Sequence, residues 1–320
     1  MTGVTMPEFH RRFTALLLAA LFFFCVWAGV GAGAGVAKTS SLRACAQRKD
    51  TLSSQLQAHA RKRAAAHPSK AGVATTGFGW YNPTLLEKIS ASWAYNGYPD
   101  TGPNGRHLQW VPEIQDLSML TPSAVKSLTL AHRDGQAKYL LTFNEPDDVH
   151  QSYMKPAAAA AVWPELERTG LKLGSPATDW LGDGWLAQFM QIAHRKHLRV
   201  NFITLHFYQD FTSPNAVTSL RERLIKIYNT YHMPLWITEI GTDDIRDWGE
   251  SMAHTPTQAL AVRYLQQLFT MLNKLSFVQR YSWYTDVCPN NPACELSSLF
   301  TPSGGITALG KAFKRARALR

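Results

Sequence analysis

The chain of 320 residues has 45% hydrophobic and 18% charged side chains, so it can bury a substantial core, and this excludes wholesale disorder. Its length fits either about two domains or a single barrel of roughly 250 residues. Four cysteines are too few for a disulfide scaffold. The formal net charge of +10 is typical of a nucleic-acid-binding protein until the charges are located.

The basic excess lies at the two ends of the chain. Residues 38–70 hold eight basic side chains and one acidic side chain, and residues 311–320 hold five basic side chains and no acidic one. Residues 71–310 carry 18 basic and 21 acidic side chains, a net charge near −3. Because a nucleic-acid-binding surface needs basic residues on the folded body, we expect no nucleic-acid partner.

The first 37 residues have the order of a secretory signal peptide. His10–Arg12 precede the apolar run Leu16–Trp27, and small residues follow through Ala37. The alternative joins residues 16–36 into one membrane anchor of 21 residues, which is long enough to cross a bilayer. Both interpretations place the rest of the chain outside the cytosol, secreted or at the cell surface.

The next segment, residues 38–70, is rich in Ala, Ser, Lys, Arg and Gln and predicts a disordered basic linker, with a short amphipathic helix as the alternative. Near the other end of the chain, Cys288 and Cys294 bracket a loop rich in Pro and Asn. In an oxidising compartment they could close a small disulfide loop. A zinc site is the weaker alternative, because residues 71–310 offer no second closely spaced cysteine pair.

From residue 71 onward, apolar runs alternate with segments of helical periodicity. Eight strands over about 250 residues are typical of a (β/α)8 TIM barrel, which we expect as a single α/β catalytic domain over residues 71–314, followed by a basic tail, residues 315–320. A doubly wound open sheet is the alternative, but no Gly-rich first turn is present. The predicted strands are Gly77–Tyr81, Ala91–Tyr95, Gln109–Ile114, Tyr139–Phe143, Leu171–Ser175, Phe202–Tyr208, Leu235–Thr238 and Arg280–Tyr284.

Two glutamates follow the fourth and seventh predicted strands: Glu145 comes after Tyr139–Phe143, and Glu239 comes directly after Leu235–Thr238. Since catalytic groups of a barrel lie where its strands end, both carboxyl groups are expected at one mouth. Glycoside hydrolysis needs such a pair, one carboxylic acid for the leaving oxygen and one carboxylate to attack or to activate water. A lone glutamate after a strand is more often a loop residue or a helix cap, but the pair favours glycoside hydrolysis.

Several motifs occur in a fixed order along the chain: Gly77-Phe-Gly-Trp80-Tyr-Asn82, Trp93-Ala-Tyr95-Asn96, Phe143-Asn-Glu-Pro-Asp147, Asp179-Trp180, Leu205-His-Phe-Tyr208, Trp236-Ile-Thr-Glu239, Tyr281-Ser-Trp283 and Leu299-Phe-Thr-Pro302. This order resembles glycoside hydrolase family 128, β-1,3-glucanases of the clan of retaining glycosidases on (β/α)8 barrels, over about residues 74–314. One departure concerns the third strand, which in that family commonly ends in Pro-Met and an aromatic residue. Here Pro112 is followed by Glu113-Ile114-Gln115, which leaves the substrate subsites of that strand open.

The resemblance implies that Glu145 is the acid/base and Glu239 the nucleophile of a retaining, endo-acting β-1,3-glucanase with a glycosyl-enzyme intermediate. Asn144 is placed to hydrogen-bond the sugar 2-OH. His206 and Tyr208, two residues apart on one strand, share a face and are expected to orient Glu239 or the substrate. A hydrogen-bonded barrel histidine without such a role is the alternative for His206.

Aromatic side chains are candidate platforms for the apolar faces of sugar rings. Trp283, at the end of the eighth predicted strand, is the first choice, with a place in the core as the alternative. The other candidates for substrate binding are Trp80, Trp93, Tyr95 and Trp180. Trp163 and Trp236 lie within predicted elements and are expected in the core.

Other functions fit the sequence less well. A β-1,4-glucanase or mannanase of the same clan keeps the chemistry and changes the sugar, and the presence of both glutamates argues against a non-catalytic carbohydrate-binding barrel. The only support for a metallohydrolase is the spacing His194-x-x-His197. A serine hydrolase is not supported, because the sequence contains no Gly-x-Ser-x-Gly motif. We therefore expect a monomer that acts on β-glucan polysaccharides or oligosaccharides without metal or cofactor. Membrane contact is expected only through an uncleaved N-terminal segment.

Overall fold

The computed structural model describes residues 69–76, 82–102, 108–179, 184–243, 245, 249–288 and 292–316. The predicted signal segment, all of the predicted linker before Ser69, Trp80, Trp180 and residues 317–320 of the predicted tail lie outside these residues. None of the described helices has the length and the apolar character that a membrane span requires.

The described strands pair in parallel, in two groups. Six of them follow the order β3-β2-β1-β9-β8-β7, and three follow the order β4-β5-β6. Parallel bridges from Gly174 to Phe202 and from Thr178 to Leu205 link β6 to β7. The strands are β1 (Ala71–Ala74), β2 (Trp93–Tyr95), β3 (Gln109–Trp110), β4 (Glu113–Ile114), β5 (Tyr139–Asn144), β6 (Lys172–Ala177), β7 (Ile203–Phe207), β8 (Leu235–Ile240) and β9 (Val278–Tyr284).

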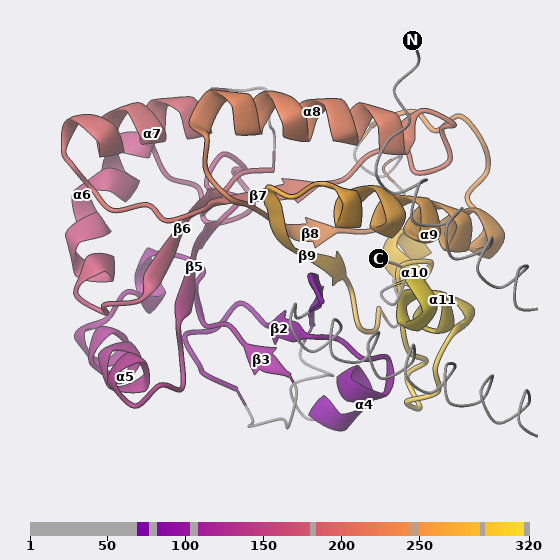
Figure 1. Cartoon of the computed structure of the whole chain (residues 1–320), viewed down its shortest axis with the longest axis horizontal. Coiled ribbons are helices and arrows are strands. Elements are labelled where there is room, and N and C mark those ends of the chain that lie inside the picture. Colours follow the sequence, from indigo (N-terminus) through magenta and orange to yellow (C-terminus); the bar gives the residue numbers. More distant parts are fainter. Residues whose placement is uncertain are drawn as a thin grey trace, which may run out of the picture. The chain divides into compact units, whose positions relative to one another are not determined.

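Helices connect these strands and lie outside them (Figure 1). The α/β alternation with parallel strands confirms the predicted α/β fold class and agrees with a (β/α)8 barrel. The helices are α4 (Pro83–Lys88), α5 (Pro122–Arg133), α6 (Pro156–Glu167), α7 (Trp185–Arg195), α8 (Ala216–Tyr231), α9 (Gln258–Lys274), α10 (Pro292–Glu295) and α11 (Ala308–Ala316), with a 3₁₀ turn η1 (Leu117–Met119).

Local sequence explains where some elements begin and end. Thr121 caps α5 by accepting a hydrogen bond from the Ala124 amide, and Pro122 occupies the first turn. The predicted third strand is divided into β3 and β4 at Val111 and Pro112, since proline has no amide hydrogen to continue a ladder. The Pro112 carbonyl still accepts a hydrogen bond from the Leu141 amide, so the chain stays beside β5.

The first strand differs from the prediction. The strand that pairs with both β2 and β9 is Ala71–Ala74, whereas the predicted Gly77–Tyr81 lies outside the described residues. Small residues are required here because a Cβ at Gly72 would lie 2.4 Å from the ring of Trp93. This strand therefore lacks the large apolar side chains by which the other strands were recognised.

The folded unit begins at Ser69, before the domain boundary that we expected. The Nζ atom of Lys70 donates hydrogen bonds to the carbonyls of Leu272, Asn273 and Leu275 at the end of α9. The Lys70 carbonyl accepts from the amide of Tyr281 on β9. Lys70 thus belongs to the barrel and not to the linker.

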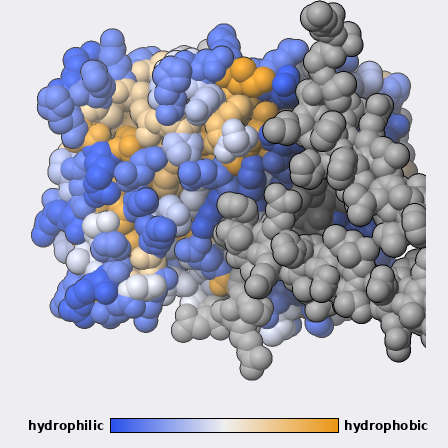
Figure 2. All heavy atoms as spheres, in the orientation of Figure 1, coloured by the Kyte–Doolittle hydropathy of each residue, from blue (hydrophilic) through white to orange (hydrophobic). Residues whose placement is uncertain are grey.

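Apolar side chains fill two regions, one between strands and helices and one among the strands themselves. The second region draws on β1, β2, β5 and β8, so its side chains point into the barrel: Ala74, Trp93, Tyr95, Val111, Leu141, Phe202 and Trp236. Phe202 and Trp236 stack there with ring centroids 4.2 Å apart. Outside the grey atoms, the face in Figure 2 is mainly hydrophilic, with small apolar patches, because the helices turn their apolar sides inward.

Candidate active site

A cavity of about 730 Å³ opens where the strands end. The carboxyl ends of parallel strands meet at one edge of the barrel, so side chains that are distant in sequence gather there. Its lining residues include Thr75 and Thr76 after β1, Tyr95 to Gly97 after β2, Glu113 and Gln115 at β4, Asn144 and Glu145 at β5, Asp179 after β6, Tyr208 after β7, Glu239 and Asp243 at β8, and Tyr284 on β9.

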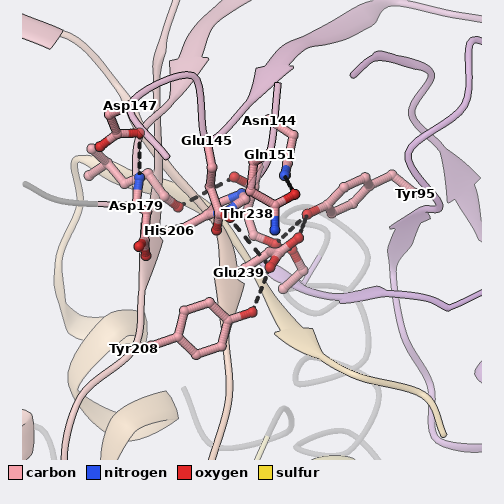
Figure 3. Close-up of polar contacts among 12 residues, drawn as sticks. Tyr95, Asn144, Glu145, Asp147, Gln151, Asp179, His206, Tyr208, Thr238 and Glu239 are labelled. Atoms are coloured by element: carbon pink, nitrogen blue, oxygen red, sulfur yellow. Dashed lines mark hydrogen bonds and ion pairs between the residues drawn. The ribbon is translucent and has the colours of Figure 1, made fainter. Parts of the chain in front are cut away.

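Glu145 and Glu239 face each other across this cavity, with His206 between them (Figure 3). The Oε1 atom of Glu145 lies 2.6 Å from His206 Nδ1, and the Oε2 atom of Glu239 lies 3.7 Å from the same nitrogen. One oxygen of each carboxyl group and one ring nitrogen all lie within 4.8 Å of one another. The structure therefore brings together the two glutamates that the sequence singled out.

Two tyrosine hydroxyls hold the Glu239 carboxyl group (Figure 3). Tyr95 donates to Oε1 at 3.0 Å and Tyr208 donates to Oε2 at 2.5 Å. Burial raises the pKa of Glu239, while His206 and the two hydroxyl donors favour its charged form. Burial also raises the pKa of both tyrosines, so they keep the protons that they donate. Glu239 is thereby held as an acceptor with a fixed orientation.

His206 is fully buried and electrostatically coupled to both glutamates. Burial alone would lower the pKa of its imidazole, but the negative charge of Glu239 and the contact with Glu145 raise it to about 9. A protonated ring donates from Nδ1 to Glu145 and offers no lone pair to a metal. The Glu145, His206 and Glu239 set can therefore act as an acid/base cluster.

The end of β5 departs from regular strand geometry where it carries the candidate catalytic residue. Phe143 and Glu145 adopt positive φ values of 34° and 42°, which side chains other than glycine rarely take. In a regular strand consecutive side chains point to opposite faces, but here both Asn144 and Glu145 line the cavity. The side-chain nitrogen Nδ2 of Asn144 donates to Gln151 Oε1 at 3.2 Å, which fixes the Asn144 side chain beside Glu145.

Trp283 and Trp93 are buried, so the prediction that they stack against sugar rings is wrong. Trp283 is fully buried on the helix-facing side of β9, where its Nε1 donates to the Ser297 carbonyl at 2.8 Å. Trp93 is 1% exposed inside the barrel, and its Nε1 donates to the Lys70 carbonyl. Neither lines the cavity, and Tyr284 occupies the position on β9 that we expected for Trp283. Trp80 and Trp180 lie outside the described residues, and the core positions predicted for Trp163 and Trp236 are confirmed.

Several acidic residues in the cavity were not among the predicted site residues. Burial raises the pKa of Glu113 to about 8, with further contributions from Glu239 and Glu145 and an opposing one from His206. Burial likewise raises the pKa of Asp179 and of Asp243 to about 7. Glu113 was visible in the sequence only as a charged residue at the end of a predicted strand.

The structure also joins Cys288 and Cys294 in a disulfide, after β9. The amide of Cys288 donates to Ser298 Oγ at 2.8 Å. This small loop follows Asp286, whose carboxylate accepts hydrogen bonds from Thr75 and Thr76 at the end of β1.

Comparison with known proteins agrees with this geometry. Residues 77–313 match the family model described as glycosyl hydrolase catalytic core. An endo-β-1,3-glucanase of family 128 (subgroup I) from Amycolatopsis mediterranei, solved in complex with laminaripentaose, is 30% identical, with a TM-score of 0.68 over 78% of this chain and 100% of that chain. An endo-β-1,3-glucanase of subgroup II from Pseudomonas viridiflava is 28% identical, with a TM-score of 0.60 over 77% of this chain and 96% of that one.

A curated relative is found in Schizosaccharomyces pombe, the alkali-sensitive linkage protein 1. It is 28% identical over 189 residues, which cover 54% of this chain. The matched segment spans only 32% of that relative's length.

Proposed function

The chain belongs to glycoside hydrolase family 128 and is a glycoside hydrolase, and we propose that it cleaves β-1,3-glucan within the chain, with retention of anomeric configuration. Two similar solved enzymes are endo-β-1,3-glucanases, which supports this substrate. One of them is described in complex with laminaripentaose, which is a β-1,3-linked glucose oligomer.

The observation that carries the retaining mechanism is the approach of the two carboxyl groups. One oxygen of Glu145 and one of Glu239 lie within 4.8 Å of each other. Retaining enzymes hold their carboxyl groups about 5–5.5 Å apart, whereas inverting enzymes need roughly 6.5–9.5 Å to admit a water molecule. This close approach of two carboxyl oxygens supports direct attack by one glutamate.

The roles follow from the hydrogen bonds of each glutamate. Glu239 accepts from Tyr95 and Tyr208, which favour its ionised form, so we assign it as the nucleophile. Its oxygen forms a bond to the anomeric carbon while the bond from that carbon to the leaving oxygen breaks, and the leaving oxygen takes a proton from Glu145. Water then attacks the anomeric carbon and gives its proton to Glu145, and the ester bond to Glu239 breaks.

His206 couples the two steps. Its Nδ1 lies 2.6 Å from Glu145 and 3.7 Å from Glu239, so it can respond to the charge on either group. When Glu239 is esterified it loses its charge, and the imidazole then interacts mainly with Glu145. We assign His206 to positioning Glu145 and to holding the charge balance of the pair.

Azide rescue with aryl β-laminaribioside tests these roles, because its leaving group needs little help from an acid. In Glu239→Ala, azide replaces the nucleophile in one displacement and should give the α-glycosyl azide. In Glu145→Ala, azide attacks the glycosyl-enzyme intermediate and should give the β-glycosyl azide. Asp134→Ala on the exposed surface is the control. The same anomer from both variants would contradict the assignment.

The substrate class is tested separately by reducing-end release from laminarin, from a β-1,4-glucan and from a mixed-linked β-glucan. Release from laminarin alone, as oligosaccharides of several lengths, is the expected result for an endo-β-1,3-glucanase. Glucose as the sole early product would indicate exo action instead. Release mainly from the β-1,4-glucan would overturn the proposed substrate.

Secretion or anchoring at the cell surface is also proposed, from the order of residues in the first 37 positions. Fusion of residues 1–70 to a reporter, followed by fractionation and N-terminal sequencing, distinguishes cleavage from anchoring. A reporter that stays in the cytosol would contradict both.

A further inference from the structure

Two polar side chains at the end of β4 face the cavity beside the catalytic glutamates. Glu113 and Gln115 are two residues apart, so they point to the same side, and both line the cavity. The Glu113 amide donates to the Tyr98 carbonyl at 2.9 Å, and the Gln115 carbonyl accepts from the Asn144 amide at 2.9 Å. The backbone of this pair is therefore fixed on both sides, and its spacing from Asn144 is set.

The loop after β2 brings the two side chains together. A Cβ atom at Gly97 would lie 3.0 Å from Gln115 Oε1 and 3.8 Å from Glu113 Oε2. Gly97 has a φ of +78°, which a glycine adopts without strain. Both side-chain oxygens thus converge on bare backbone, where a larger residue would displace them.

The Glu113 side chain has unused hydrogen-bonding capacity. It is 2% exposed, and no other described residue makes a hydrogen bond to its carboxyl group. Buried polar groups normally find a partner, so an open carboxyl group at a cavity wall indicates a ligand. Burial raises the pKa of Glu113 to about 8, so near neutral pH the group offers one donor and one acceptor.

The charge around the cavity restricts the ligand. Among the described residues its lining holds six carboxyl groups and neither lysine nor arginine: Glu113, Glu145, Asp148, Asp179, Glu239 and Asp243. Uronic acids and sulfated sugars would be repelled. A carboxylic acid beside a carboxamide instead suits the hydroxyls of a neutral sugar, which need both donors and acceptors.

We propose that Glu113 and Gln115 form a subsite for the glucosyl unit on the non-reducing side of the sugar that is cleaved. This rests on the proposed function and on the prediction from the sequence that Asn144 hydrogen-bonds the 2-OH of the cleaved sugar. Because Gln115 is hydrogen-bonded to Asn144 through the backbone, the C2–C3 side of that sugar faces β4. In a β-1,3-glucan the preceding unit departs from O3, next to that 2-OH, whereas in a β-1,4-glucan it departs from O4. The pair therefore selects the linkage as well as the sugar.

Aryl β-glucoside, aryl β-laminaribioside and aryl β-cellobioside test this, since only the non-reducing unit differs among them. Glu113→Leu and Gln115→Leu should each lower kcat/KM for the laminaribioside about tenfold or more relative to the glucoside, mainly through KM. Glu113→Gln keeps the shape and hydrogen bonding of the side chain and should recover part of the loss. Glu165→Gln, exposed on α6, is the matched control and should leave kcat/KM unchanged for both substrates.

The ratio of the two substrates separates a subsite from a general effect. A variant that merely disturbs Glu145 or the fold lowers both rates together and leaves the ratio unchanged, and that result in both leucine variants would overturn the subsite. Should Glu113→Leu not fold, Glu113→Gln and Gln115→Leu decide the matter in the same way. A wild-type enzyme that cleaves the cellobioside in preference to the laminaribioside would overturn the proposed function itself, and the subsite with it.

Discussion

Replacing Trp283 distinguishes a core residue from a sugar platform. Its indole is fully buried, packs edge-on against Phe269 at a centroid distance of 6.4 Å, and donates one hydrogen bond to the Ser297 carbonyl. Trp283→Ala should therefore lower the free energy of unfolding by about 3–5 kcal/mol. Since 1 kcal/mol shifts Tm by roughly 2–4 °C in a domain of this size, Tm should fall by about 6–20 °C.

The assay measures thermal unfolding and laminarin turnover on the same preparation of the protein. Turnover per folded molecule should stay near the wild-type value below the unfolding transition, because Trp283 does not line the cavity. Tyr284→Ala is the matched comparison, since the neighbouring side chain lines the cavity and should lose activity with a smaller loss of stability. A Trp283→Ala protein with a near-normal Tm and a hundredfold loss of activity would refute the core assignment.

Three further predictions test the charges and contacts of the barrel. Tyr95→Phe and Tyr208→Phe each remove a hydrogen bond to Glu239 and should lower kcat/KM roughly ten- to a hundredfold, measured on laminarin, with near-normal Tm. The proton on Glu113, with a folded pKa of about 8 against about 4.3 unfolded, stabilises the fold fully below pH 4.3, and this stability is lost as pH rises to 8. Urea unfolding should therefore show wild type losing more stability than Glu113→Gln between pH 5 and pH 8; equal losses would contradict the assigned burial. Lys70→Met should lower the free energy of unfolding by about 1–2 kcal/mol in urea, because three carbonyls at the end of α9 lose a donor. An unchanged free energy of unfolding would indicate that Lys70 belongs to the linker.

The sequence predicted the fold class and the two glutamates because both depend on local order. Apolar runs alternate with helical segments, and Glu145 and Glu239 each lie within two residues of the end of such a run. The first strand, Ala71–Ala74, was not predicted because it lacks large apolar side chains. The reason for its small residues is the ring of Trp93, which leaves no space beside Gly72. This constraint comes from a neighbouring strand, so the sequence of the segment alone does not reveal it.

The prediction of a sugar platform at Trp283 is wrong for a different physical reason. Alternation along β9 separates Trp283 from Tyr284, but the sequence does not say which of the two faces the barrel interior. Both faces of a barrel strand are apolar, so hydrophobicity gives no direction. Glu113 was likewise visible as a charged strand residue, yet its convergence with Gln115 at Gly97 depends on the path of a separate loop.

The most direct test of the central claim is to trap the glycosyl-enzyme intermediate with an activated 2-deoxy-2-fluoro-β-laminaribioside and to locate it by peptide mass spectrometry. The fluorine slows both steps, and the good leaving group lets the first proceed without the acid. We predict one fluorolaminaribiosyl adduct, on the peptide that contains Glu239, formed with loss of activity. An adduct on Glu145 or on Glu113 would contradict the assignment of Glu239 as the nucleophile. So would turnover of the fluorinated substrate without inactivation and without any adduct.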